Sequence, residues 1–115
     1  MREIKFRAFY KNKIRDVVSI DWRNDFCSLA KGFVEIPLKD INLMQYTGLK
    51  DMNGVDIYEG DIVRFDTNVQ ILESEVTYYH GMFTIKKYGE KIPLFTGLKV
   101  IGNKFENPEL LEDKK

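Results

Sequence analysis

The chain has 115 residues, of which 43% are hydrophobic and 31% are charged, and its formal net charge is zero. This length suits one domain that buries its own core, and the composition excludes an intrinsically disordered chain. A single cysteine, Cys27, excludes an internal disulfide, and no apolar run reaches signal-peptide or membrane-span length, so we expect a cytoplasmic protein.

The first 40 residues show the period-two alternation of half-buried strands. One face of the segment REIKFRAFY is apolar and contains Ile4, Phe6, Ala8 and Tyr10. A turn over residues 11–13 and an antiparallel partner strand over 14–22 follow. Residues 33–36 form a short apolar run that Pro37 ends or confines to a sheet edge.

Charge is unevenly distributed along the chain. Residues 1–15 contain six basic groups and one acidic group, a net +5, whereas residues 16–62 contain four basic and nine acidic groups, a net −5. Residues 63–115 balance at eight of each. The first strand pair is therefore predicted to present a basic face, although solvated outer faces of strands have the same composition.

The centre of the chain, LMQYTGLKDMNGVDIYEGDIVRF over residues 43–65, predicts a β-hairpin and a second sharp turn into an apolar strand. Asn53-Gly54 is the strongest hairpin dipeptide, because a type I′ turn needs positive φ at both central residues. Glu59-Gly60-Asp61 then turns the chain into the strand Ile62-Val63-Arg64-Phe65.

The C-terminal part predicts further short strands. Residues 75–79 and 82–88 indicate a hairpin around His80-Gly81, and residues 99–102 indicate a last strand. Asn107 and Pro108 have the residue types of a helix cap and a first helical position, so a short C-terminal helix is expected.

Short strands at close spacing predict a mainly β fold. We expect a small β-barrel of SH3-like type in the C-terminal part, with an N-terminal β-hairpin extension and a short C-terminal helix. The barrel expectation is a fold-level analogy based on the turn at Gly60-Asp61. Residues 1–115 are read as a single domain, and an N-terminal β lobe over 1–50 with a barrel lobe over 51–115 remains an open alternative.

Three segments of the chain resemble the YopX family of phage and prophage proteins. These are MREIKFRAFY at the start, residues 43–63 in the centre, and residues 100–111 at the end, VIGNKFENPELL. Phe9 stands where the family often has Trp, and Met52 interrupts the commoner charged loop. The resemblance implies a small β-rich phage or prophage protein in a bacterial host cell, with an SH3-like barrel. The family has no assigned activity, so the resemblance transfers no catalytic residue.

The sequence offers little support for catalysis or metal binding. Cys27 and His80 are too few to form a structural zinc site, and neither a nucleophile elbow nor a phosphate-binding glycine motif occurs. Four acidic residues cluster in the turn-rich centre of the sequence: Asp51, Asp56, Glu59 and Asp61. Such a cluster is more typical of solvated hairpins than of a metal or acid–base site. We expect no enzyme activity, no metal, no cofactor and no small-molecule substrate.

Two binding hypotheses remain. The favoured one is a non-catalytic protein-interaction or assembly module, with an unidentified protein partner or self-association through a strand edge. Its aromatic contacts would come from exposed tyrosines; in the alternative interpretation the rings of these tyrosines pack inward. The candidates are Tyr46, Tyr58, Tyr78, Tyr79 and Tyr88.

The second hypothesis is an accessory nucleic-acid-binding protein, whose N-terminal strand pair interleaves cations and aromatics. Its candidate residues are Arg2, Lys5, Arg7, Phe9, Lys11 and Lys13. A pI of about 6.6 counts against a dedicated nucleic-acid binder.

Overall fold

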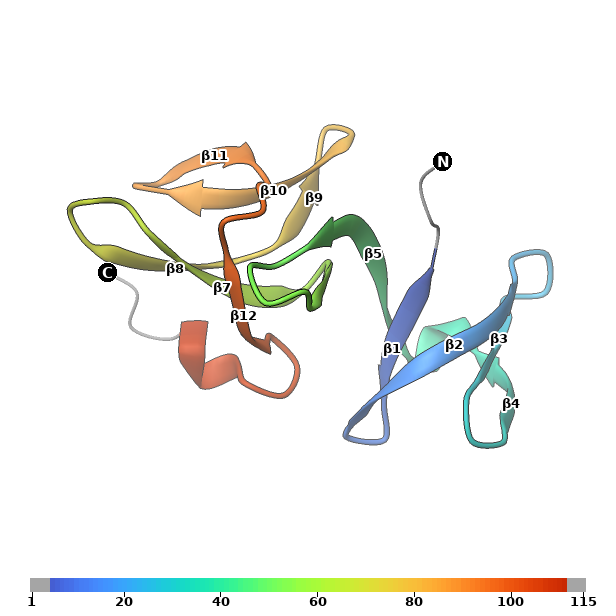
Figure 1. The fold of residues 1–115 in the computed structure, drawn as a ribbon. Coiled ribbons are helices and arrows are strands. Elements are labelled where there is room, and N and C mark those ends of the chain that lie inside the picture. Colours follow the sequence, from blue (N-terminus) through green and yellow to red (C-terminus); the bar gives the residue numbers. More distant parts are fainter. Residues whose placement is uncertain (1–4, 112–115) are drawn as a thin grey trace. The chain divides into compact units, whose positions relative to one another are not determined.

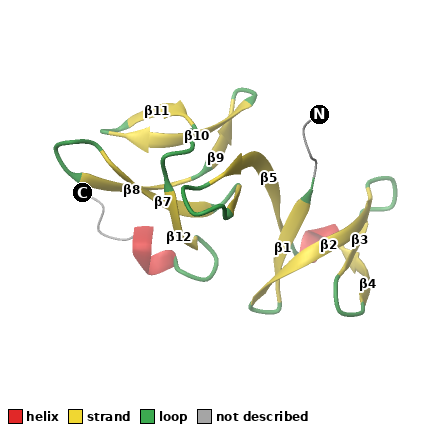
Figure 2. Ribbon diagram, in the orientation of Figure 1, coloured by secondary structure: helices red, strands yellow, loops and turns green. Residues whose placement is uncertain are grey.

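The computed structural model describes residues 5–111, so the candidate residue Arg2 lies outside the described part. The chain divides into two compact units, Met1–Gln45 (unit 1) and Tyr46–Lys115 (unit 2). The division falls inside strand β5 (Asn42–Lys50), whereas the sequence suggested lobes that meet after residue 50. Both units are built from strands joined by tight turns, so the predicted mainly β class is confirmed (Figures 1 and 2).

Unit 1 is an antiparallel sheet with the strand order β4-β3-β2-β1-β5. Its elements are β1 (Phe6–Tyr10), β2 (Lys13–Asp21), β3 (Phe26–Leu29), β4 (Phe33–Pro37), the 3-10 turn η1 (Leu38–Asp40) and the first part of β5. Lys11 and Asn12 join β1 to β2 with φ values of 52° and 61°. Two consecutive positive φ values define a type I′ turn, whose twist matches that of the paired strands. The predicted N-terminal hairpin is therefore confirmed.

One face of the unit 1 sheet is covered by an apolar core, and we call it the core face of unit 1. Its buried residues are Ala8, Cys27, Leu29 and Ile41. Because side chains alternate along a strand, Ala8 and Tyr10 point to the core face while Arg7 and Phe9 point to the opposite face. This alternation decides which of the basic residues share a surface.

Unit 2 contains two three-stranded antiparallel sheets, with the orders β12-β7-β8 and β11-β10-β9. The second part of β5 also pairs with β6, and Tyr46 lies opposite Tyr58. The elements are β6 (Asp56–Tyr58), β7 (Asp61–Asp66), β8 (Ile71–Glu75), β9 (Thr77–Tyr79), β10 (Met82–Lys87), β11 (Glu90–Pro93), β12 (Lys99–Asn103) and the 3-10 turn η2 (Pro108–Leu111). The predicted hairpin around His80-Gly81 is present as β9 and β10.

The core of unit 2 is larger than that of unit 1. Its buried residues are Ile57, Val63, Phe65, Val76, Ile85 and Leu98. They come from β6, β7, β10 and the connections that precede β9 and β12, so side chains from several strands and loops pack together in one cluster. This apolar burial is the main force that stabilises the unit.

The SH3-like barrel is not confirmed, because the sheets of unit 2 are open within the described residues. Each three-stranded sheet ends in strands without a further ladder partner. Val76, between β8 and β9, instead exchanges backbone hydrogen bonds with the preceding turn: its N–H donates to Asp61 O and its carbonyl accepts from Gly60 N, both at 2.8 Å. This junction separates the two ladders, so a barrel does not close.

Two local expectations also need correction. The C-terminal helix is not confirmed, because Pro108–Leu111 forms only a 3-10 turn, in which Leu110 N donates to Asn107 O. The β5–β6 hairpin is present, but its turn is not type I′, since only Gly54 of Asn53-Gly54 has positive φ. The reason is Asp51, whose side chain organises a five-residue loop between the two strands.

Candidate binding surfaces

The acidic residues of the central motif hold the backbone in place. Asp51 is only 6% exposed, and its two carboxylate oxygens accept three backbone N–H bonds, from Asn53, Val55 and Val100. Burial alone raises the pKa of Asp51, but these hydrogen bonds and the charge of Lys99 outweigh it, so the pKa lies below its ordinary value. Asp51 is thus an ionised structural anchor.

Asp61 and Asn103 have similar roles. Asp61, 1% exposed, accepts a hydrogen bond from Tyr58 N at 2.8 Å. Asn103 Oδ1 accepts from the N–H groups of Phe105 and Glu106 and so orders the connection after β12. Asp56 is ion-paired with Lys50. Asp51, Asp56 and Asp61 therefore have separate backbone and lysine partners, and Glu59 lies partly buried in the turn between β6 and β7.

The two residues with nucleophilic or metal-binding potential lie in different units. Cys27 is 2% exposed in the core of unit 1, and this burial raises the pKa of its thiol. His80 lies in the exposed turn between β9 and β10 of unit 2, with its ring centroid 4.0 Å from that of Tyr79. Residues 5–111 contain no group of three or more His, Cys, Asp or Glu side chains arranged to hold a metal ion. No helix among them is both long and apolar enough to cross a membrane.

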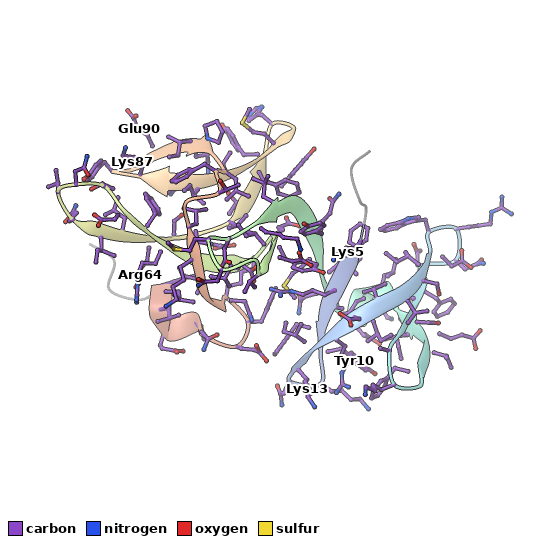
Figure 3. The ribbon with its side chains drawn as sticks, in the orientation of Figure 1. Lys5, Tyr10, Lys13, Arg64, Lys87 and Glu90 are labelled. Carbon is purple, nitrogen blue, oxygen red and sulfur yellow. The ribbon has the colours of Figure 1, made fainter. Side chains whose placement is uncertain are left out.

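The sheet divides the predicted nucleic-acid-binding residues between surfaces. Lys5, Arg7 and Phe9 lie on the face opposite the core face of unit 1, where Arg7 faces Asp16 across the strand pair. Lys13 instead lies opposite Tyr10, on the core face, and Lys11 is in the turn. Lys5 is near the start of β1, and Tyr10 and Lys13 are at the other end of the hairpin (Figure 3).

Two further cations join Lys11 and Lys13 at the end of this hairpin. Arg15 lies opposite Ala8 on the core face, and Lys31 lies in the β3–β4 turn. We call these four residues, Lys11, Lys13, Arg15 and Lys31, the basic tip. Neither Arg15 nor Lys31 is among the binding residues predicted from the sequence. The even spacing of Arg15 from Lys13 is a signal that could have identified Arg15, whereas no local sequence signal identifies Lys31.

The candidate tyrosines also separate into two groups. Tyr46 and Tyr58 are 5% and 9% exposed, and their rings pack against each other at a centroid distance of 5.6 Å, so both side chains are buried. Tyr78, Tyr79 and Tyr88 are 55%, 47% and 55% exposed. Only the second group is accessible to a partner.

The outer face of the β9–β11 sheet has exposed aromatic, apolar and cationic side chains around a buried centre, since Thr84 is only 3% exposed. Strand register places Tyr79 opposite Met82, Thr77 opposite Thr84, and Lys86 opposite Lys91. Because Phe83 and Ile85 of β10 point to the core, these residues face the other way. Lys91 Nζ lies 4.9 Å from the centroid of the Tyr79 ring, and this cation–π contact joins the two ends of the face.

A pocket of about 340 Å³ adjoins this face. Thr77, Lys86 and Lys91 line it from the sheet, and the remaining lining residues are Glu73, Ser74, Glu75 and Leu111. The two carboxylates already have partners: Glu73 accepts from Arg64 at 2.7 Å, and Glu75 lies 3.2 Å from Lys104 Nζ. Neither Lys86 nor Lys91 forms an ion pair within residues 5–111.

The fold and these surfaces define a small, mainly β protein of two open-sheet units. A family model described as YopX protein matches residues 4–112. The chain therefore belongs to the YopX family, which confirms the resemblance drawn from its three sequence segments.

A solved structure supports the same conclusion at the level of fold. The chain is similar to the crystal structure of protein EF1440 from Enterococcus faecalis, with 30% sequence identity and a TM-score of 0.69, over 97% of this chain and 100% of that one. No curated protein matches the chain.

Proposed function

We propose that the protein is a non-catalytic protein-interaction module, and that unit 2 binds an acidic, partly apolar segment of a partner protein on the outer face of its β9–β11 sheet. The main support is one observation: exposed Tyr79 and Met82 share this face with Lys86 and Lys91, which have no carboxylate partner in the described chain, and Lys91 Nζ lies 4.9 Å from the Tyr79 ring centroid. A phage or prophage origin belongs to the same proposal and rests on the family resemblance. A cytoplasmic location belongs to it as well and rests on the lone cysteine and the hydropathy of the sequence.

The composition of the face suits a protein partner. Tyrosine and methionine are enriched at protein interfaces, where their side chains give large contact areas. Tyr79 and Met82, each 47% exposed, lie directly opposite each other in the register of the hairpin. The type I′ turn at His80 and Gly81, with φ values of 49° and 86°, fixes their relative position before binding.

The charges indicate what kind of segment the face selects. The pocket contains two lysine ammonium groups that have no carboxylate partner among residues 5–111, while both of its own carboxylates are ion-paired. A partner carboxylate, from an Asp or Glu side chain or a chain terminus, therefore gains an attraction, and an apolar neighbour on the partner can cover Tyr79 and Met82.

The sheet edges are less suited to binding than this face. In β4 the register shifts between Cys27 and Leu29 of its partner strand, Glu35 has a φ of 53°, and Pro37 ends the strand. The four-residue edge strand β11 ends at Pro93. Bulges, prolines and short lengths are features that prevent edge-to-edge pairing, so the proposal favours a side-chain surface over self-association through an edge.

Affinity capture with two charge-reversed variants tests the proposal. Wild-type protein, Lys91→Glu and Lys87→Glu are each used to capture proteins from the cells that carry the gene, and quantitative mass spectrometry compares the three sets. Lys87 is the matched control, because it is exposed on the same hairpin but lies opposite Glu90, on the other side of the sheet (Figure 3).

We expect a protein that wild-type and Lys87→Glu retain and Lys91→Glu loses by about tenfold or more, the loss expected when one ion pair becomes a repulsion. If the Lys91→Glu variant captures the same proteins as wild type in the same amounts, the proposal is wrong. A wild-type protein that captures only its own copies, and forms a dimer in light scattering, would favour self-association instead.

A further inference from the structure

The basic tip of unit 1 forms a hollow lined with cations. Lys13, Arg15 and Lys31 line a pocket of about 190 Å³ together with Ile14, Asp16 and Ala30. The backbone holds the β3–β4 turn against β2, because Ala30 N donates to Asp16 O at 2.9 Å. Lys13 at the start of β2 and Lys31 in the β3–β4 turn therefore line one hollow.

Arg15 is held in a fixed orientation within this hollow. Its Nε donates to Tyr10 O at 3.0 Å, and its guanidinium carbon lies 4.3 Å from the centroid of the Phe33 ring. Phe33 in turn packs edge-to-face against Tyr10 at a centroid distance of 5.8 Å. These contacts use one donor of the guanidinium fork and leave its terminal Nη groups available for a ligand oxygen.

The local charge favours an anion. The tip contains four cations, and Asp16 is the one acidic residue that lines its pocket. None of the four cations forms an ion pair with a residue in the described range 5–111. Unit 1 as a whole has nine basic and six acidic residues, a net +3, whereas unit 2 has nine basic and twelve acidic residues, a net −3. The zero net charge of the chain thus conceals a cationic unit.

We infer that the basic tip binds the phosphate backbone of a nucleic acid, without base specificity. The guanidinium and ammonium groups of the tip, which have no carboxylate partner in the described part of the chain, suit successive phosphate oxygens. Release of counterions drives such an interaction. This site lies in unit 1 and is independent of the unit 2 face proposed for a protein partner. The structure thereby assigns to the tip two residues, Arg15 and Lys31, beyond those suggested by the strand pattern.

Fluorescence anisotropy with a short labelled thymidine oligonucleotide tests this inference on the full chain over a series of salt concentrations. The test variant is Lys13→Gln/Lys31→Gln, which removes two exposed tip cations. The control is Arg23→Gln/Lys39→Gln, which removes the same charge from exposed positions of unit 1 outside the tip. Urea unfolding of all three proteins verifies that the substitutions leave stability unchanged.

If four phosphates are contacted, the logarithm of the wild-type association constant falls with the logarithm of salt with a slope of about −3, and the test variant gives about −1.4. At about 50 mM salt the test variant binds at least about tenfold more weakly, whereas the control stays within about twofold of wild type. Equal losses in test and control variants, or no wild-type binding at about 50 mM salt, would overturn the inference.

Discussion

The carboxylate of Asp51 accepts a hydrogen bond at 2.9 Å from the backbone N–H of Val100, which lies 49 positions later in the chain. The other oxygen of Asp51 accepts two N–H bonds within its own loop, at 2.8 and 2.9 Å. One side chain therefore shapes the β5–β6 loop and fixes that loop against β12. The most recognisable segment of the sequence thus serves the fold of unit 2.

Replacement of Asp51 by alanine should strongly destabilise the protein. The Asp51→Ala substitution leaves three backbone N–H groups without their acceptor, and we expect a loss of about 3 kcal/mol in the free energy of unfolding. The control is Asp66→Ala, because exposed Asp66 accepts one such bond, from Asn68 N at 3.2 Å, and should cost about 1 kcal/mol or less. Urea unfolding followed by far-UV circular dichroism measures both; equal costs would refute the anchoring role.

The same carboxylate predicts a pH dependence. The pKa of Asp51 is lowered in the folded protein, so its contribution to stability is complete above the unfolded-state pKa of about 3.9 and is lost as the pH falls through the folded-state value. Wild-type stability should therefore decrease more than that of Asp51→Asn between about pH 6 and about pH 3. Urea unfolding at both pH values provides the measurement, and parallel decreases would contradict the prediction.

Two glycines should respond differently to alanine. A Cβ atom at Gly102 would lie 2.5 Å from Oδ1 of Asn107, which accepts a hydrogen bond from Asn103 N. Gly102→Ala should therefore cost about 1 to 3 kcal/mol, as overpacking does elsewhere. At Gly97 the nearest atom is 3.7 Å away, so Gly97→Ala should be neutral or stabilise by about 0.5 kcal/mol. Thermal unfolding of the two variants and of wild type measures these effects, and similar melting temperatures for the two variants would contradict the prediction.

Cys27 should be nearly inert in the folded protein. It is 2% exposed, and burial raises the pKa of its thiol, so both access and the thiolate fraction are reduced. Alkylation by iodoacetamide should be at least about 100-fold slower than in urea, because it requires opening of the core. A cysteine at the exposed position 18, introduced as Val18→Cys in a Cys27→Ala background, supplies the reference rate. Comparable rates for the two cysteines would show that the core of unit 1 is open.

Local sequence signals predicted the strands and several turns, since alternation and glycine-containing dipeptides act over a few residues. The hairpins at Lys11-Asn12 and His80-Gly81 follow directly from such signals. Asn53-Gly54 misled the prediction, because the loop geometry depends on Asp51 and on its distant partner Val100. Barrel closure also depends on contacts between distant strands, and the turn at Gly60-Asp61 does not determine it.

The binding surfaces were less predictable than the strands. The pattern of cations and aromatics identified Lys11 and Lys13, but the pleat of β1 separates them from Arg7 and Phe9. Lys31 joins the tip because β3 pairs with β2 and Ala30 N bonds to Asp16 O, and periodicity does not reveal this pairing. On unit 2, the tyrosine count did not distinguish buried Tyr46 from exposed Tyr79, because strand pairing decides which side of a sheet is covered.

Site-specific photocrosslinking in the cells that carry the gene tests the central claim most directly, namely that unit 2 binds a protein through the outer face of its β9–β11 sheet. A benzoylphenylalanine is placed in one protein at Tyr79 and in another at Tyr88, a comparably exposed tyrosine of the same unit that lies in the β10–β11 turn. We predict a covalent adduct with one partner protein from position 79 and none from position 88. No adduct from position 79, or the same adduct from both positions, would contradict the claim.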